Sequence, residues 1–186
     1  MTAVTFDPVI EQARESLFKR FTWEKGHADV WRIFLDGSTF AAIVAGLAEP
    51  WRAAGITHVA GIESRGFLLG GAVANELAAG FQAIRKAGGM LPDPKIGTTT
   101  ALNYRGLSHN LYMQDALSAD DLVLLVDDWA EKGSQAAGAR DLIEQSGARF
   151  AGVSLLVDQL DDSMRLKLRR VTSLVRAEEL GDSDAK

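Results

Sequence analysis

Residues 123–135 read Val123-Leu124-Leu125-Val126-Asp127-Asp128-Trp129-Ala130-Glu131-Lys132-Gly133-Ser134-Gln135. The first four residues are apolar without alternation, which predicts a strand buried on both faces, as in a parallel sheet. Two carboxylates follow, and a helical pattern begins at about Gln135. Open parallel sheets bind ligands at the carboxyl ends of their strands, and the free amides of a helix amino-terminus favour an anion. The segment therefore fits either a site for a phosphorylated ligand or an ordinary strand-loop-helix with an acidic cap.

Helical and strand patterns alternate along the rest of the chain. Apolar periodicity predicts further strands at 56–62, 81–85, 150–157 and 171–175. It predicts helices at about 7–21, 38–55, 67–79, 135–145 and 162–169. A strand, a helix and a strand in close succession imply a parallel pair with a crossover helix. We therefore expect an α/β fold with a doubly wound, mainly parallel sheet and flanking helices.

Two segments lack a clear period. Residues 22–32 mix aromatic and charged side chains, and Trp23 and Trp31 either frame a flat ring by stacking or form a small apolar lid or dimer contact. Residues 86–110 are rich in glycine, proline and threonine, which is typical of a flexible functional loop, part of which can form a hairpin. We expect both segments to belong to a single domain that spans residues 1–186.

The composition argues against several classes of protein. A formal net charge of -5 argues against a protein that coats nucleic acid or anionic membranes. The chain has no cysteine, which excludes disulfides, a thiolate nucleophile and cysteine metal sites. No apolar run reaches the length of a membrane span, and the first residues lack a signal-peptide pattern. We therefore expect a cytoplasmic protein with neither a nucleic-acid nor a membrane partner.

Three blocks of the chain resemble type I phosphoribosyltransferases, and adenine phosphoribosyltransferases in particular. Residues 123–135 resemble the phosphoribosyl-diphosphate-binding signature, in which an apolar run, two acids and a small loop follow one another. Residues 84–88 with Leu91-Pro92 resemble another family segment. The family's Gly-Leu-Asp-Ser-Arg-Gly-Phe turn is matched by Gly61-Ile62-Glu63-Ser64-Arg65-Gly66-Phe67-Leu68-Leu69-Gly70. The blocks keep family order over about 56–157, and they imply the type I phosphoribosyltransferase fold.

The resemblance implies a reaction and several substrate contacts. A 5-phosphoribosyl group would pass from phosphoribosyl diphosphate to a nitrogenous base, first of all a purine, with release of pyrophosphate in nucleotide salvage. Arg65, next to Ser64, matches the arginine that holds pyrophosphate, and a guanidinium can fork two phosphate oxygens. Lys86, beside Arg85, matches a lysine near the same phosphates. Before Gly55 the resemblance is poor, and the N-terminal 36 residues are expected to form a hood on the side of the base.

The acid pair and its loop are expected to hold the ribose 5-phosphate. Asp127 and Asp128 match the acids that contact ribose hydroxyls, directly or through Mg²⁺ and water. Mg²⁺ suits oxygen ligands and substrate phosphates and needs few protein groups. The backbone amides of residues 131–135 would hold the 5-phosphate, and Trp129, next to the acids, would report binding by its fluorescence. The resemblance implies that the substrate-binding residues of this loop are Lys132, Gly133, Ser134 and Gln135.

The same comparison shows where the chain departs from the family. Adenine-specific members read roughly Ala-Thr-Gly-Gly-Thr after the acid pair and two apolar residues, where this chain reads Glu131-Lys132-Gly133-Ser134-Gln135. Asn103 stands where those members carry a glutamate before a tyrosine, and an asparagine cannot exchange a proton in that role. Gly89-Met90 replaces a lysine near the pyrophosphate.

Glu131 can supply the missing acid/base group. In phosphoribosyltransferases for 6-oxopurines the corresponding residue is an aspartate close to the purine imidazole nitrogen, which implies a proton role for Glu131. A carboxylate ~4 Å from one phosphate charge costs roughly 4 kcal/mol at an effective dielectric of about 20, so Glu131 should point toward the base or the solvent. The alternative is a first-turn acid that only satisfies the helix dipole.

Two other interpretations explain the same departures. The chain could be a non-catalytic regulator of this fold that binds phosphoribosyl diphosphate or a nucleotide, because losing acid/base assistance costs roughly 10²–10⁴-fold in rate. It could also be a related enzyme that uses another ribosyl phosphate donor or an unusual base. In either case family sites lie near a subunit interface, so the resemblance implies a homodimer.

Overall fold

The computed structural model describes residues 7–86, 90–102 and 107–181. Its strands are β1 (Trp23–Glu24), β2 (His27–Ala28), β3 (His58–Ile62), β4 (Gly80–Lys86), β5 (Lys95–Thr99), β6 (Asn110–Gln114), β7 (Leu122–Ala130), β8 (Arg149–Asp158) and β9 (Val171–Arg176). Its α-helices are α1 (Pro8–Arg20), α2 (Trp31–Phe34), α3 (Gly37–Ala48), α4 (Arg65–Glu76), α5 (Ser134–Gln145) and α6 (Asp162–Lys167). Two short 3-10 helices are η1 (Glu49–Trp51) and η2 (Ala177–Leu180). No helix within these ranges is long and apolar enough to cross a membrane.

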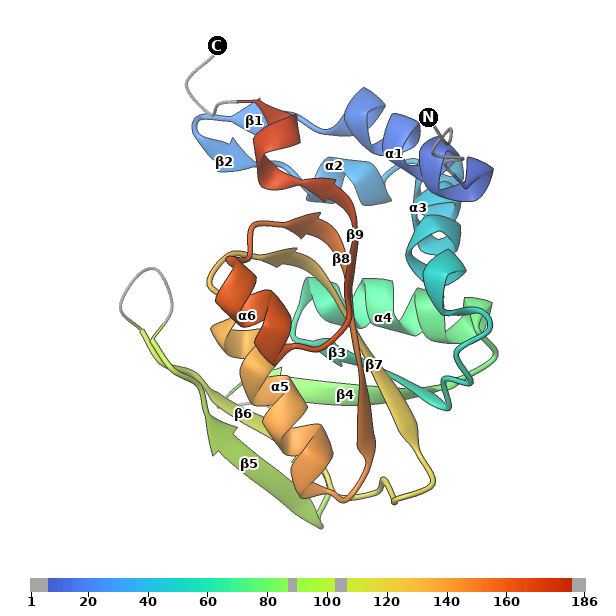
Figure 1. The fold of residues 1–186 in the computed structure, drawn as a ribbon. Helices are drawn as coiled ribbons and strands as arrows, with labels where there is room; N and C mark the ends of the chain where they lie inside the picture. Colours follow the sequence, from blue (N-terminus) through green and yellow to red (C-terminus); the bar gives the residue numbers. More distant parts are fainter. Residues whose placement is uncertain (1–6, 87–89, 103–106, 182–186) are drawn as a thin grey trace.

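A single seven-stranded sheet forms the centre of the described part of the chain, in the order β5-β6-β4-β3-β7-β8-β9 (Figure 1). The neighbours from β4 to β9 are parallel, whereas β6 pairs antiparallel with both β4 and β5. Helices α3 and α4 pack on one face and α5 packs on the other (Figure 1). This arrangement confirms the prediction of a doubly wound, mainly parallel α/β sheet.

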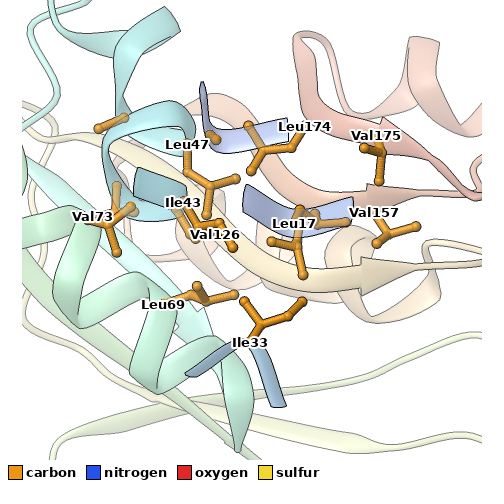
Figure 2. Packing of buried hydrophobic residues seen from close by; sticks show 14 of the residues in the cluster. Leu17, Ile33, Ile43, Leu47, Leu69, Val73, Val126, Val157, Leu174 and Val175 are labelled. Atoms are coloured by element: carbon orange, nitrogen blue, oxygen red, sulfur yellow. The ribbon is translucent and has the colours of Figure 1, made fainter. Parts of the chain in front are cut away.

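The central strand β7 is buried on both faces. Leu124 and Val126 belong to an apolar cluster with α1, α3 and α4, which Figure 2 shows around Val126. Val123 and Leu125 belong to a second cluster with α5. All four side chains are fully buried, and each burial stabilises the fold by about 1.5–3 kcal/mol. Apolar surroundings on both faces explain why this run shows no alternation.

Strand β7 is longer than the sequence predicts. Its parallel pairing with β8 continues through Asp127, opposite Leu155, and through Trp129, opposite Val157. The strand therefore ends at Ala130 rather than at the last residue of the apolar run. Both acids are held by the regular strand geometry at the carboxyl end of β7, and the loop that follows them is shorter than expected.

A small hood lies beyond the carboxyl ends of the parallel strands (Figure 1). The irregular segment 22–32 folds into the β1–β2 hairpin and the first half of α2, and the Trp23 indole N–H donates to the Leu180 carbonyl at 3.2 Å. This bond ties the hairpin to η2. Part of the predicted flexible loop forms β5, which pairs with β6 as a hairpin. Residues 87–89 and 103–106 of that loop, with Asn103, lie outside the described residues.

Two glycines bring the turn between β3 and α4 against the sheet. A Cβ built on Gly61 would lie 2.1 Å from the carbonyl oxygen of Gly66. A Cβ on Gly66 would lie 3.1 Å from Asp127 Oδ1. Because only hydrogen fits at Gly61, the start of α4 can approach the end of β7, and Arg65 reaches the acid pair.

We expect Gly61→Ala to lower the free energy of unfolding by about 1–3 kcal/mol, the usual cost of overpacking a tight site. Urea unfolding followed by tryptophan fluorescence measures the change. The matched control is Gly71→Ala in α4, where a Cβ meets no atom within 4 Å. This control should be neutral or stabilising by about 0.5–1 kcal/mol, since alanine favours a helix over glycine. Equal stability of the two variants would contradict the close approach.

Candidate active site

The carboxyl ends of β3, β4 and β7 and the hood enclose one large cavity. Its volume is about 1290 Å³. The predicted site residues that line it are Ser64, Arg65, Lys86, Asp127, Asp128, Trp129, Glu131, Lys132, Gly133, Ser134 and Gln135. Arg85 is the one predicted site residue that is absent from the lining. The β3–α4 turn, the acid pair and the loop before α5 therefore converge on a common space.

Arg65 and Asp128 form the ion pair at the centre of this cavity. Arg65 Nε lies 2.9 Å from Asp128 Oδ2, and Asp128 is buried whereas Arg65 is partly exposed. Arg65 does not form a surface ion pair with Glu63 or Glu76, because Glu63 binds Arg85 and Glu76 binds Arg52. Within the described ranges no residue binds the terminal guanidinium nitrogens of Arg65, which can therefore face an anion in the cavity.

The two neighbouring carboxyls oppose each other electrostatically. Burial, and then repulsion by Asp128, raises the pKa of Asp127 well above its ordinary value. Burial also raises the pKa of Asp128, although the Arg65 guanidinium counteracts part of this effect. Asp127 Oδ1 accepts a hydrogen bond from the Asp128 amide at 3.0 Å. The pair is therefore suited to hold hydroxyl donors or a cation, either of which favours the carboxylate form.

The loop between β7 and α5 offers backbone amides to the cavity. Gly133 adopts φ +66° at the helix start, and no side chain caps the amides that follow. A Cβ on Gly133 would lie 2.6 Å from Met164 Cγ and 2.7 Å from Leu160 Cδ2. The β8–α6 segment thus leaves room only for glycine here. Uncapped amides at the positive end of α5 form a favourable place for a phosphate.

Arg85 supports the site from outside the cavity. Its Nη2 lies 3.1 Å from Glu63 Oε1, and its Nη1 donates to the Met90 carbonyl at 3.1 Å. Glu63 Oε2 also accepts a hydrogen bond from the Lys86 amide at 3.1 Å. The Arg85 guanidinium lowers the pKa of Glu63, so the carboxylate stays charged and joins the end of β4 to the β3–α4 turn.

Aromatic side chains form the hood side of the cavity. The ring centroids of Trp23 and Trp129 lie 6.1 Å apart, and Phe21 packs edge-on against Trp23 at 5.4 Å. Trp31 also lines the cavity but packs against Phe34 and is 54% exposed. Flat apolar surfaces of this kind suit a planar ring. The contact of Trp23 with Trp129 spans about a hundred residues, and no local pattern in the sequence indicates it.

Known proteins are similar to this chain in sequence and in fold. The adenine phosphoribosyltransferase of Bradyrhizobium sp. strain BTAi1 is 39% identical over 149 residues, which cover 80% of this chain and 82% of the relative. The chain belongs to the adenine phosphoribosyltransferase family. The resemblance seen in the sequence is therefore confirmed. No protein-family model matches the chain.

Solved structures of the adenine phosphoribosyltransferase family share the fold. The enzyme from Rhodothermus marinus has a TM-score of 0.78 at 28% identity, with 89% of this chain and 99% of that chain covered. The enzyme from Saccharomyces cerevisiae, complexed with adenine and an imino-altritol bisphosphate, has a TM-score of 0.74 at 28% identity, with 88% and 99% covered.

The buried acid pair predicts a specific dependence of stability on pH. The folded-state pKa of Asp127 lies above its unfolded value, so the folded state binds more protons between the two values and loses stability as the pH rises through that window. Asp127→Asn cannot ionise. In the absence of ligand and metal we expect this variant to be more stable than the parent protein at about pH 8, with the difference shrinking toward about pH 4.

Urea unfolding of both proteins across this pH range measures the difference. Asp120→Asn, at an exposed position, is the matched control and should follow the parent protein within about 0.5 kcal/mol. An Asp127→Asn variant that is less stable than the parent at about pH 8 would show that the carboxylate is stabilised in the fold.

Proposed function

We propose that the chain transfers the 5-phosphoribosyl group of phosphoribosyl diphosphate to adenine, which forms AMP and pyrophosphate. The observation that carries the proposal is the convergence of Arg65, the acid pair and the uncapped start of α5 on one cavity. In this member of the adenine phosphoribosyltransferase family, these groups suit a ribose that carries a phosphate at one end and a pyrophosphate at the other. Trp23, Trp31 and Trp129 line the cavity and offer aromatic surfaces against which a planar base could pack.

The 5-phosphate and the pyrophosphate of the donor would bind at opposite ends of the cavity. The amides from Gly133 to Gln135 would hold the 5-phosphate, since nothing in the described chain caps the start of α5. Arg65 would fork the pyrophosphate oxygens while its Nε keeps the contact with Asp128. Lys86, at the end of β4, would add a second positive charge to the departing pyrophosphate.

Asp127 and Asp128 would bind the ribose hydroxyls and fix the sugar. Their oxygens also fit Mg²⁺, which prefers oxygen ligands. Among the described residues no group of three or more histidine, aspartate or glutamate side chains could hold a metal alone. An ion with few protein ligands suits Mg²⁺ bound mainly by substrate oxygens and water. When bound, Mg²⁺ would neutralise charge on the pyrophosphate.

Glu131 would accept the proton that the base loses. Adenine gives up one ring N–H when its nitrogen bonds to the anomeric carbon, and a carboxylate in the cavity can take that proton. Glu131 lines the cavity directly after β7, as the first residue of the loop 131–135 that follows the acid pair. We extend the proposal to a homodimer, as the resemblance implies, and to a cytoplasmic location, as the sequence features predict.

A base panel tests the function. Incubation with phosphoribosyl diphosphate, Mg²⁺ and one base at a time should release pyrophosphate with adenine at a rate at least about tenfold above hypoxanthine, guanine and uracil, a margin expected when a site pairs with base edges. AMP formation, followed by chromatography, should match pyrophosphate release mole for mole. Binding of phosphoribosyl diphosphate without release for any base would overturn the proposal.

Glu131→Gln keeps the shape of the side chain but cannot take a proton. We expect kcat with adenine to fall by about 10²-fold or more, whereas KM for phosphoribosyl diphosphate stays within about threefold. The matched control is Glu144→Gln on the exposed side of α5, which should leave both constants unchanged. If Glu131→Gln retains full kcat, another group moves the proton, and the role assigned to Glu131 is wrong.

A further inference from the structure

The hood side of the cavity contains a polar side chain that the family resemblance does not assign. Gln159 follows the end of β8 and lines the cavity beside Trp129. The Trp129 indole N–H donates to Gln159 Oε1 at 2.9 Å. The Gln159 backbone amide donates to the Ala130 carbonyl at 2.9 Å. Both ends of the residue are therefore fixed against the end of β7.

The bond to Trp129 determines which way the amide group of Gln159 faces. An indole nitrogen can only donate a hydrogen bond, so the atom opposite it must be the amide oxygen. The donor character of the indole therefore decides between the two possible orientations of the Gln159 amide, which have nearly the same shape. The NH₂ group faces away from the indole, and none of the described residues accepts a hydrogen bond from it. Two N–H donors are left for a molecule in the cavity.

The position of Gln159 places these donors on the side of the base. Ala130 pairs with Asp158 in the sheet register, so Gln159 leaves the sheet beside the first residue of the phosphate loop, Glu131. The aromatic rings of Trp23 and Trp129 lie on the same side. The anion-binding groups, in contrast, come from the β3–α4 turn and the start of α5. A planar base next to Trp129 would meet an amide donor at its edge.

We propose that Gln159 donates a hydrogen bond to an unprotonated ring nitrogen of the purine and so contributes to selection of the base. This inference rests on the proposed function, because it requires a purine in the cavity. Trp129 acts as the positioning residue for the amide. A base that presents a C–H or an N–H at that ring position leaves the donor unpaired and binds more weakly, as an unmet hydrogen bond costs affinity.

Deaza-adenines test the inference atom by atom. The 1-, 3- and 7-deaza analogues of adenine each replace one ring nitrogen by C–H. For each analogue, kcat/KM relative to adenine is compared between the parent protein and Gln159→Leu. The intrinsic reactivity of each analogue is the same for both proteins, so it cancels in the ratio of ratios. For one analogue we expect this double ratio to change by roughly 3- to 10-fold, and for the other two by less than about twofold.

A second variant separates donation from the positioning of Trp129. Gln159→Glu keeps an oxygen for the indole N–H but lacks the NH₂ group, so it should lose the same discrimination as Gln159→Leu. Gln145→Leu, at the exposed end of α5 and outside the cavity lining, is the matched control and should keep the parent ratios. Thermal unfolding of all variants checks that they fold.

The outcomes separate this inference from the proposed function. Double ratios near one for all three analogues, even with reduced overall activity, would mean that Gln159 only orients Trp129 and would overturn the proposal. Retained discrimination in Gln159→Glu would do the same. Binding of AMP and of its deaza counterparts, followed by tryptophan fluorescence, gives the double ratio without turnover. Absence of AMP synthesis would therefore count against the proposed function alone, and the binding ratios would still decide the role of Gln159.

Discussion

The approach of two backbone segments at Gly61 and Gly66 is the constraint on which the site depends. With only hydrogen at Gly61, the first turn of α4 lies directly over β3 and beside the end of β7. Arg65 begins that helix and meets Asp128 across the gap. The ion pair joins two βα units that are separated by about sixty residues of sequence. Sheet geometry and a contact between glycines, rather than a flexible loop, thus set the distance between the two anion-binding ends of the cavity.

Local patterns were sufficient to predict most of the sheet and part of the site. The apolar run before Asp127 predicts a strand buried on both faces, and the structure packs alternate residues into two separate clusters. The Gly133 turn and the helix after it follow from glycine and periodicity, which act over a few residues. Ser64, Arg65 and Lys86 were found by resemblance and all line the same cavity.

Nonlocal contacts account for what the sequence could not reveal. The extension of β7 past the apolar run depends on pairing with β8, which no pattern within β7 indicates. The partner of Arg65 and the anchoring of Arg85 on Glu63 are choices among several nearby carboxylates that only the fold decides. The hood is held by contacts such as that of Trp23 with Leu180, more than 150 residues away. Gln159 shows no motif, and its role emerges only from the bond to Trp129.

The acid pair links ligand capture to proton exchange with the solvent. Burial raises the pKa values of both acids, and repulsion by Asp128 raises that of Asp127 further, so the pair retains protons at a pH where exposed aspartates have lost them. A cationic group that binds there must displace these protons as well as water. The heat measured in a calorimeter will then vary with the ionisation enthalpy of the buffer, and apparent affinity will rise with pH. Two adjacent carboxyls at the end of β7 thereby make the fraction of protein that holds a cationic ligand depend on the pH of its surroundings.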